Sequence, residues 1–196
     1  MDDSVKQAMA KWPNVPHCYG WLGLDARGGW RMRDEAAQQA GGAGDRIAHE
    51  ALLGFINRNY AHDDGGRWYF QNGPQRVYVD LETTPYIART DPEKGFLLQT
   101  GETLAQPDHV YMTERGQLIL QAGDKVAMLD DRDLAQCTGA LSMEGVPASD
   151  ERLMDWLASD APAPMTMAHQ GRDLPVQRIA STELARHFGF ESQPRA

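Results

Sequence analysis

Short runs of apolar and aromatic residues alternate with polar, glycine-rich turns along most of the chain. The clearest case is 61–85, where the apolar runs 68–70 and 77–81 flank the turn 71–74 (QNGP). Aromatic and β-branched residues bounded by Gly, Asn and Pro predict two strands joined as a hairpin. Similar runs predict strands at 19–24, 30–33, 87–89, 96–99, 110–112, 118–120, 126–129, 165–169 and 174–179.

Helical spacing of apolar residues occurs in a smaller part of the chain. Residues 47–60 carry one apolar stripe that predicts a helix, with Asp45 placed to cap it. Shorter helices are predicted at 2–11, at 133–138, after Ser149 and at 183–188, where Gly189 ends the last one. The small and polar residues 35–44 predict a loop, and 158–164 (ASDAPAP) predicts an extended linker.

Four segments repeat one turn pattern: 25–33, 63–73, 90–101 and 113–123. Each has polar residues and a Gly just before a large apolar residue that opens a strand, and the last three add Gln-x-Gly after the apolar triplet. The pattern predicts hairpin tips at which Gly supplies a positive φ. Two explanations stay open. One is common turn chemistry, and the other is a duplication with a second, degraded copy.

These elements predict an α+β fold that is mainly antiparallel, with curved sheets each wrapped around a helix. The predicted parts are an N-terminal sheet-and-helix unit at 1–90, a second, degraded unit at 91–160, and a small C-terminal hairpin-plus-helix appendage at 161–196.

Composition narrows the classes of partner. The chain has 196 residues and a formal net charge of -9, whereas nucleic acids and anionic membranes attract clustered Lys and Arg. No window approaches the roughly 20 apolar residues of a membrane-spanning helix. The first residues (MDDSVKQAMAKWP) lack the apolar stretch of a secretory signal, so we expect a cytoplasmic protein with reduced cysteines.

Amide and guanidinium groups concentrate on the turn of the 61–85 hairpin and on the helix end before it. Such groups offer donors and acceptors to a polar ligand, provided that the hairpin packs across the helix end. A solvated turn and a helix terminus rich in Asn explain the same residues without a ligand. The candidate ligand-binding residues are Asn57, Asn59, Tyr60, Gln71, Asn72, Gln75 and Arg76.

Catalytic and metal-binding motifs are weak. His17 and Cys18 are adjacent on an extended segment, where neighbouring side chains point to opposite faces, and the histidines lack zinc-site spacing. The acidic residues of 130–133 (DDRD) fit a helix N-terminus as well as acid–base work. Asp80 and Glu82 alternate with apolar neighbours and are expected to face solvent. No catalytic residue, metal or cofactor is predicted.

The segments 12–21 (WPNVPHCYGW), 55–60 (FINRNY) and 66–85 together resemble a proteobacterial family of unknown function, as do 171–179 and 185–190. The order of glycine turns, Trp strands and helix is also similar to a second family of unknown function. That family has tandem half-barrel sheet-and-helix motifs and is suspected of ligand sensing or signal transduction. The resemblance implies an architecture and no residue roles. It also implies a tighter connection than residues 35–44 provide.

The leading hypothesis is a non-catalytic binding or regulatory module for a small polar ligand or a protein partner. An enzyme is one alternative, perhaps a hydrolase that uses Cys18 or an acid of 130–133. A protein–protein interaction module is another, and an exposed apolar patch over Met165 and Met167 would favour it or a homodimer.

Overall fold

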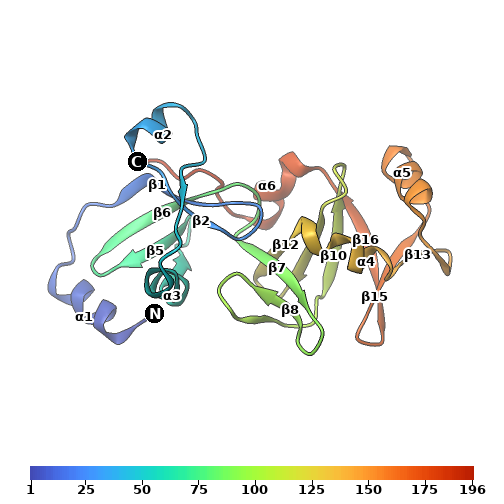
Figure 1. The fold of residues 1–196 in the computed structure, drawn as a ribbon, viewed down its shortest axis with the longest axis horizontal. Helices are drawn as coiled ribbons and strands as arrows, with labels where there is room; N and C mark the ends of the chain where they lie inside the picture. The colour runs from blue at the N-terminus through green and yellow to red at the C-terminus, as the bar shows by residue number, and fades with distance from the viewer. The chain divides into compact units, whose positions relative to one another are not determined.

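The computed structural model describes residues 1–196 and divides them into two compact units (Figure 1). The first unit contains Met1–Pro85, Gln99–Gly101 and Ala185–Ala196, and the second contains Tyr86–Leu98 and Glu102–Leu184. The first and longest segment of the first unit therefore ends at Pro85, and two short segments from later in the chain complete the unit. The segment 161–196, predicted as a separate appendage, is shared between the two units.

The first unit is built on a six-stranded sheet in the order β3-β2-β1-β6-β5-β4. Neighbouring strands are antiparallel except β1 and β6, which run parallel and place Leu22 opposite Val79. The strands are β1 (Cys18–Leu24), β2 (Trp30–Met32), β3 (Asp45–Arg46), β4 (Tyr60–His62), β5 (Trp68–Asn72) and β6 (Gln75–Leu81).

Helix α3 (Glu50–Arg58) packs on one face of this sheet. Its Phe55 ring meets Phe70 of β5 edge to face, with ring centroids 5.3 Å apart, and Ile56 is buried. Helix α1 (Asp3–Lys11) lies at the N-terminus, and its apolar residue Val5 is buried. The core of the first unit is therefore the layer between α3 and the sheet.

The segment between β2 and α3 differs from the sequence prediction. Residues expected to form a loop contain helix α2 (Glu35–Gln39), because the Asp34 carboxylate accepts a hydrogen bond from the Ala37 N–H and Ala and Gln favour helix. Asp45 does not cap α3 but lies in β3. The helix begins later, at Glu50, and His49 Nδ1 accepts from the Leu52 N–H.

The second unit contains a ten-stranded sheet in the order β14-β13-β15-β16-β10-β11-β12-β7-β8-β9. Two of its strand pairs are parallel, β7 with β12 and β10 with β16. The strands are β7 (Tyr86–Asp91), β8 (Gly95–Leu98), β9 (Thr103–Leu104), β10 (His109–Thr113), β11 (Leu118–Ala122), β12 (Lys125–Leu129), β13 (Leu141–Met143), β14 (Val146–Pro147), β15 (Met165–His169) and β16 (Arg172–Ile179).

The helices after β12 are short. They are η1 (Asp131–Asp133), α4 (Leu134–Thr138), α5 (Asp150–Ala158), η2 (Ser181–Glu183) and α6 (Leu184–Phe188). The α+β class is confirmed and most neighbouring strands are antiparallel, although both sheets also contain parallel pairing and are therefore mixed. No helix is long and apolar enough to cross a membrane.

The predicted hairpin of β15 and β16 joins the second sheet instead of standing apart from it, because β16 pairs with β10. Met165 and Met167 are only 3% and 1% exposed. The apolar patch that would have favoured a homodimer or an interaction module is therefore not present at these residues.

Strands β1–β6 and β7–β12 have the same topology. In both sets the order across the sheet is third, second, first, sixth, fifth, fourth, and the first and sixth strands are parallel. The backbone pairing also matches, since Glu82 N–H donates to the Leu24 carbonyl (3.0 Å) as Asp130 N–H donates to the Ala88 carbonyl (2.9 Å). Each set thus consists of two three-stranded meanders.

The first hairpin turn of each meander has the same local chemistry. A side-chain oxygen at the start of the turn accepts hydrogen bonds from backbone N–H groups further along it, as Asp25 Oδ1 does from Gly29 (2.7 Å). The equivalent acceptors are Asp63, Asp91 and Thr113. A glycine with φ between 72° and 80° follows in every case, which confirms the predicted hairpin tips; these are Gly28, Gly66, Gly95 and Gly116.

Candidate functional site

The predicted ligand-binding residues at the end of α3 form hydrogen bonds within the first unit. Asn59 is 1% exposed; its Oδ1 accepts from the Asp2 N–H (2.8 Å), and its Nδ2 donates to the Phe55 carbonyl (2.9 Å). Asn57 Oδ1 accepts from Trp30 Nε1 (2.8 Å), and the Tyr60 hydroxyl donates to the Pro85 carbonyl (2.9 Å). These bonds fix the helix end and the start of β4.

The predicted residues on the β5–β6 turn have varied surroundings. Gln71 is fully buried and donates through Nε2 to the Gly73 carbonyl (2.9 Å), while Gln75 Nε2 donates to the Pro16 carbonyl (2.9 Å). The Arg76 guanidinium lies over the Tyr69 ring, 4.5 Å from its centroid. Asn72 is exposed and lines an apolar cavity described below. A ligand site made of all seven residues stays a prediction.

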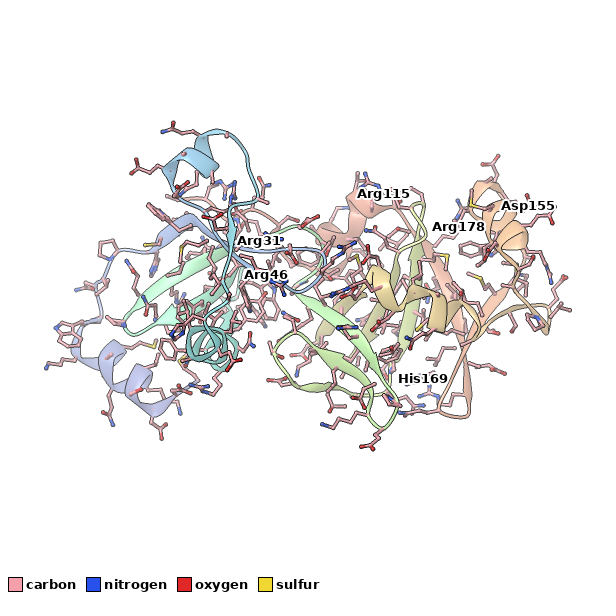
Figure 2. All side chains as sticks on the ribbon, viewed as in Figure 1. Arg31, Arg46, Arg115, Asp155, His169 and Arg178 are labelled. Atoms are coloured by element: carbon pink, nitrogen blue, oxygen red, sulfur yellow. The ribbon has the colours of Figure 1, made fainter.

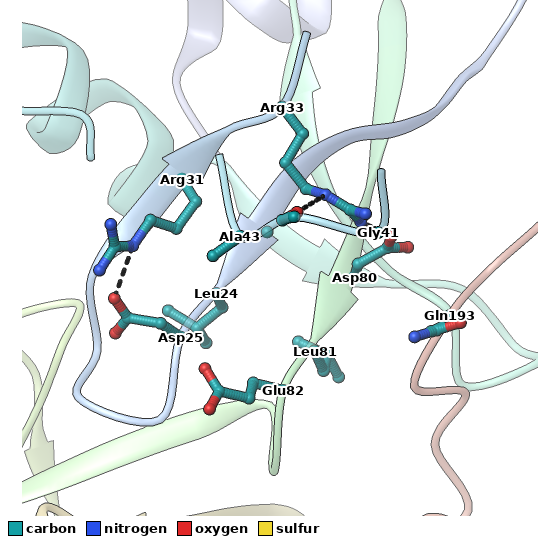
Figure 3. Close-up of a pocket in the computed structure, with 12 residues that line it drawn as sticks. Leu24, Asp25, Arg31, Arg33, Gly41, Ala43, Asp80, Leu81, Glu82 and Gln193 are labelled. Carbon is teal, nitrogen blue, oxygen red and sulfur yellow. Dashed lines mark hydrogen bonds and ion pairs between the residues drawn. The ribbon is translucent and has the colours of Figure 1, made fainter. Parts of the chain in front are cut away.

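A cavity of about 260 Å³ lies on the face of the first sheet opposite α3, and we call it the polar cavity (Figure 3). Its walls come from β1, β2, β6, the loop after α2 and the C-terminal segment. The lining residues are Gly23, Leu24, Asp25, Arg31, Arg33, Gly41, Gly42, Ala43, Asp80, Leu81, Glu82 and Gln193. Carboxylates, guanidiniums and an amide thus share one small space.

Two ion-pair groups form the charged part of the polar cavity. Arg31 Nε donates to Asp25 Oδ2 (2.8 Å), and Arg33 pairs with Asp80 while its Nε donates to the Gly42 carbonyl (3.0 Å). Arg195 binds Asp80 through both terminal nitrogens, at 2.6 and 3.2 Å. The expectation that Asp80 faces solvent was wrong: it is 8% exposed, because Arg33 and the C-terminal segment cover it.

Two ionisable groups at the cavity and its edge, Asp25 and Arg195, are held in their charged forms. Burial raises the pKa of Asp25, but hydrogen bonds from the Gly29 N–H and the Arg31 side chain outweigh that effect and hold its pKa below the usual value. The hydrogen bond to Asp80 raises the pKa of Arg195. The cavity therefore presents fixed charges of both signs.

The polar cavity exists because one meander departs from the shared plan. In three meanders a Gln-x-Gly turn joins the second and third strands, at Gln71, Gln99 and Gln121. In the first meander a longer connection between Met32 and Asp45 takes its place and brings Gly41, Gly42 and Ala43 to the cavity wall. The unexpected length of 35–44 was the signal in the sequence that pointed to this site.

The central strands of the two sheets differ at matching positions. The pairing of Glu82 with Leu24 and of Asp130 with Ala88 makes Gly23 equivalent to Ile87, and Asp80 equivalent to Met128. Ile87 and Met128 are 1% and 3% exposed. Where the second sheet has buried apolar side chains, the first therefore has a glycine and a carboxylate.

A second cavity, of about 280 Å³, lies on the α3 side of the same sheet, and we call it the apolar cavity. Leu22 lines this cavity whereas its neighbour Gly23 lines the polar one, as expected for alternating faces of a strand. Its lining residues are Cys18, Trp21, Leu22, Met32, Ile47, Leu52, Ile56, Phe70, Asn72 and Val77.

Two of the acidic residues considered for catalysis, Asp130 and Asp133, have structural partners. Burial raises the pKa of Asp130, but hydrogen bonds from the side chain and backbone of Arg132 outweigh it and lower that pKa to about 2. Asp133 accepts from the Thr90 N–H (2.8 Å) and from Arg89 (3.2 and 3.3 Å). A carboxylate held ionised in this way is a poor proton shuttle near neutral pH.

The fold and its sites define a protein with two curled, mixed sheets, the first of which carries two cavities on opposite faces. The chain belongs to a family described as "Protein of unknown function (DUF2946)", whose profile matches residues 1–195. A solved structure of a DUF1285 family protein from Silicibacter pomeroyi DSS-3 has a similar fold, with a TM-score of 0.51, 12% sequence identity and 86% of each chain covered. The comparison with curated proteins gives no match.

Proposed function

We propose that this protein is a non-catalytic binding module and that the polar cavity holds its ligand, a small zwitterion such as an amino acid. The observation that carries the proposal is the concentration of charged side chains in a cavity whose wall is formed in part by the long connection of the first meander. Local departures from a consistent structural plan tend to mark functional positions in proteins. The departure here supplies both the space and the polar groups.

The chemistry of the lining supports a ligand with both charges. Arg31 and Arg33 offer guanidinium donors, which suit a carboxylate, and Glu82 and Asp25 offer acceptors for an ammonium group. Glu82 is exposed, and one of its oxygens accepts from the Ala26 N–H (3.0 Å). The volume of about 260 Å³ lies just below the usual range for ligand pockets, which fits a very small molecule.

Thermal-shift and calorimetric titration with the common amino acids tests this proposal. A ligand that binds only the folded protein stabilises it by about 2.7 kcal/mol at 100 times its Kd. We expect at least one amino acid to raise the Tm, and acetate or methylamine alone to do so far less. Equal stabilisation by acetate would indicate a simple anion site, and no response to any of these compounds would contradict the proposal.

Matched arginine variants locate the binding. Arg31→Met should weaken amino-acid binding by about tenfold or more, because a charge-assisted hydrogen bond contributes about 1.5 kcal/mol or more. Arg46→Met is the control, since Arg46 is exposed on β3 directly beside Arg31 and does not line the cavity (Figure 2). Equal effects of the two substitutions would place the ligand elsewhere.

We also propose that the shared topology of β1–β6 and β7–β12 reflects an internal duplication. The matching strand order and the equivalent pairing at Leu24 and Ala88 support it, together with the four similar turns. Structure-based alignment of further family members tests this proposal. Turn residues that follow one pattern in all four meanders would support a duplication, and unrelated turn patterns would contradict it.

A further inference from the structure

The apolar cavity has the dimensions and lining of a second binding site. Its volume is about 280 Å³, whereas an engineered apolar cavity of about 150 Å³ is large enough to bind benzene. Part of its lining is exposed, at Trp21, Met32 and Asn72, so the cavity opens to solvent beside α3. A small molecule that enters it would remove apolar surface from water, which favours binding.

The lining indicates what the occupant is made of. No charged side chain lines the cavity, and the lining side chains that can form hydrogen bonds are the Asn72 amide, the Trp21 indole N–H and, weakly, the Cys18 thiol. A charged ligand would lose its hydration without gaining an ionic partner. Asn72 can accept or donate one hydrogen bond. The ligand part that enters the cavity is therefore uncharged and apolar, with one polar group.

The walls favour a flat ring over a flexible chain. The rings of Trp21 and Phe70 lie among the lining groups, and aromatic side chains favour stacked or edge-to-face contacts with another ring. Trp21 is 40% exposed and Met32 is 46% exposed. These two side chains thus reach from the lining to solvent, which gives a ring a route into the cavity.

We propose that the apolar cavity binds a small, uncharged aromatic molecule of about the size of indole, with the ring among Trp21, Phe70 and Ile56. This site lies on the opposite sheet face from the polar cavity and does not depend on the function proposed for that cavity. An apolar body held by a few placed polar groups is the usual composition of a small-molecule site.

Protection of Cys18 from alkylation tests the proposal. The two cysteines are free, and Cys18 lines the cavity whereas Cys137 is buried, where burial, together with the nearby Asp133 charge, raises the pKa of its thiol to about 11. The rate of iodoacetamide labelling of Cys18, followed by peptide mass spectrometry, should fall about tenfold when indole is present at about ten times its Kd. Labelling of Cys137 should not change.

Two further measurements make the outcome decisive. Met32→Glu places a carboxylate at the exposed rim and should abolish the protection, whereas Met154→Glu changes a methionine that is 67% exposed on α5 and should leave it intact. Methyl NMR signals of Ile47 and Ile56 should shift with indole in the unmodified protein. Unchanged labelling with unchanged methyl signals would overturn the proposal. Protection by octanol but not by indole would overturn the assignment of an aromatic ligand.

Discussion

The strand sets β1–β6 and β7–β12 share one strand order but differ in the side chains at their central strands. In the parallel pair of β7 and β12 in the second sheet, Ile87 and Met128 are register partners with buried apolar side chains. At the equivalent positions of the first sheet, Gly23 and Asp80 face the polar cavity. The backbone hydrogen bonds at Leu24 and Ala88 are the same, so this pairing does not require either arrangement. The scaffold is therefore stable with a packed or an open surface at this position, and the side chains choose between them.

The connections between the second and third strands of the meanders also differ between the first meander and the other three. Short Gln-x-Gly turns close three of the meanders, and the Gln71 and Gln121 side chains donate to the carbonyls of Gly73 and Gly123. The first meander has α2 and a glycine-rich loop instead, and α3 precedes its partner meander. Both cavities of the first unit lie next to these additions. Additional residues in these connections thus add walls and space next to the sheet without changing its strand order.

The largest expected effect comes from giving the second sheet the glycine of the first. Ile87→Gly should lower the free energy of unfolding by about 4 kcal/mol, because it removes a fully buried side chain and places glycine inside a strand. Urea denaturation followed by circular dichroism measures this loss. Val146→Gly is the control, since Val146 is 53% exposed on β14 and should cost about 1 kcal/mol. A small loss for Ile87→Gly would mean that the second sheet tolerates a cavity as well.

The next effect concerns the buried carboxylate of the first sheet. Asp80→Asn keeps the shape of the side chain but removes the charge that Arg33 and Arg195 share, and it should destabilise the protein by about 3 kcal/mol. The measurement is again the urea unfolding curve. The exposed Asp64→Asn exchange should change little. If both substitutions cost the same, Asp80 would be no more than a surface charge.

The third prediction concerns how the stability of the second unit changes at acid pH, through the carboxylate of Asp130. The folded-state pKa of Asp130 is about 2, below its usual 3.8, so its ionised form stabilises the fold above pH 4 and this contribution is lost as the pH falls from about 4 to 2. The loss should be about 2 kcal/mol at most. Unfolding curves from pH 5 to pH 2 should be flatter for Asp130→Asn than for the exposed control Asp124→Asn. Parallel curves would show that Asp130 contributes nothing to acid stability.

Filling the polar cavity is expected to change the free energy of unfolding least. The same substitution is expected to change ligand binding most. Gly23→Val should change the unfolding free energy by less than about 1 kcal/mol, because a Cβ at Gly23 has its nearest neighbours at ordinary contact distances, 3.5 Å from the Asp80 carbonyl oxygen and 3.7 Å from Arg33 Cδ. The isopropyl group would occupy the cavity, so amino-acid binding measured by calorimetry should disappear. Unchanged binding with an intact fold would remove the polar cavity from consideration.

The strands and their turns were predictable because their causes are local. Alternating apolar residues and turn-forming Gly, Asp and Asn act on their neighbours in the chain, and the predicted hairpin tips carry positive φ at Gly28, Gly66, Gly95 and Gly116. The start of α3 was less predictable. The apolar periodicity began at residue 47 and predicted a helix from there. In the structure Asp45 and Arg46 pair with β2 as a third strand, and α3 begins at Glu50. Sheet pairing with a strand distant in sequence overrode the local pattern.

The sequence by itself determined the α+β class, most strands, the similar turns and the presence of an unusually long connection at 35–44, although helix α2 within it was not predicted. Only the tertiary structure decided which charges meet: Arg195 pairs with Asp80 across more than a hundred residues of chain, and Arg31 and Arg33 line the same cavity as Glu82. The physical reason is range. Backbone conformation responds to adjacent residues, whereas burial and ion pairing depend on which strands come to lie side by side, and spacing along the chain does not contain that information.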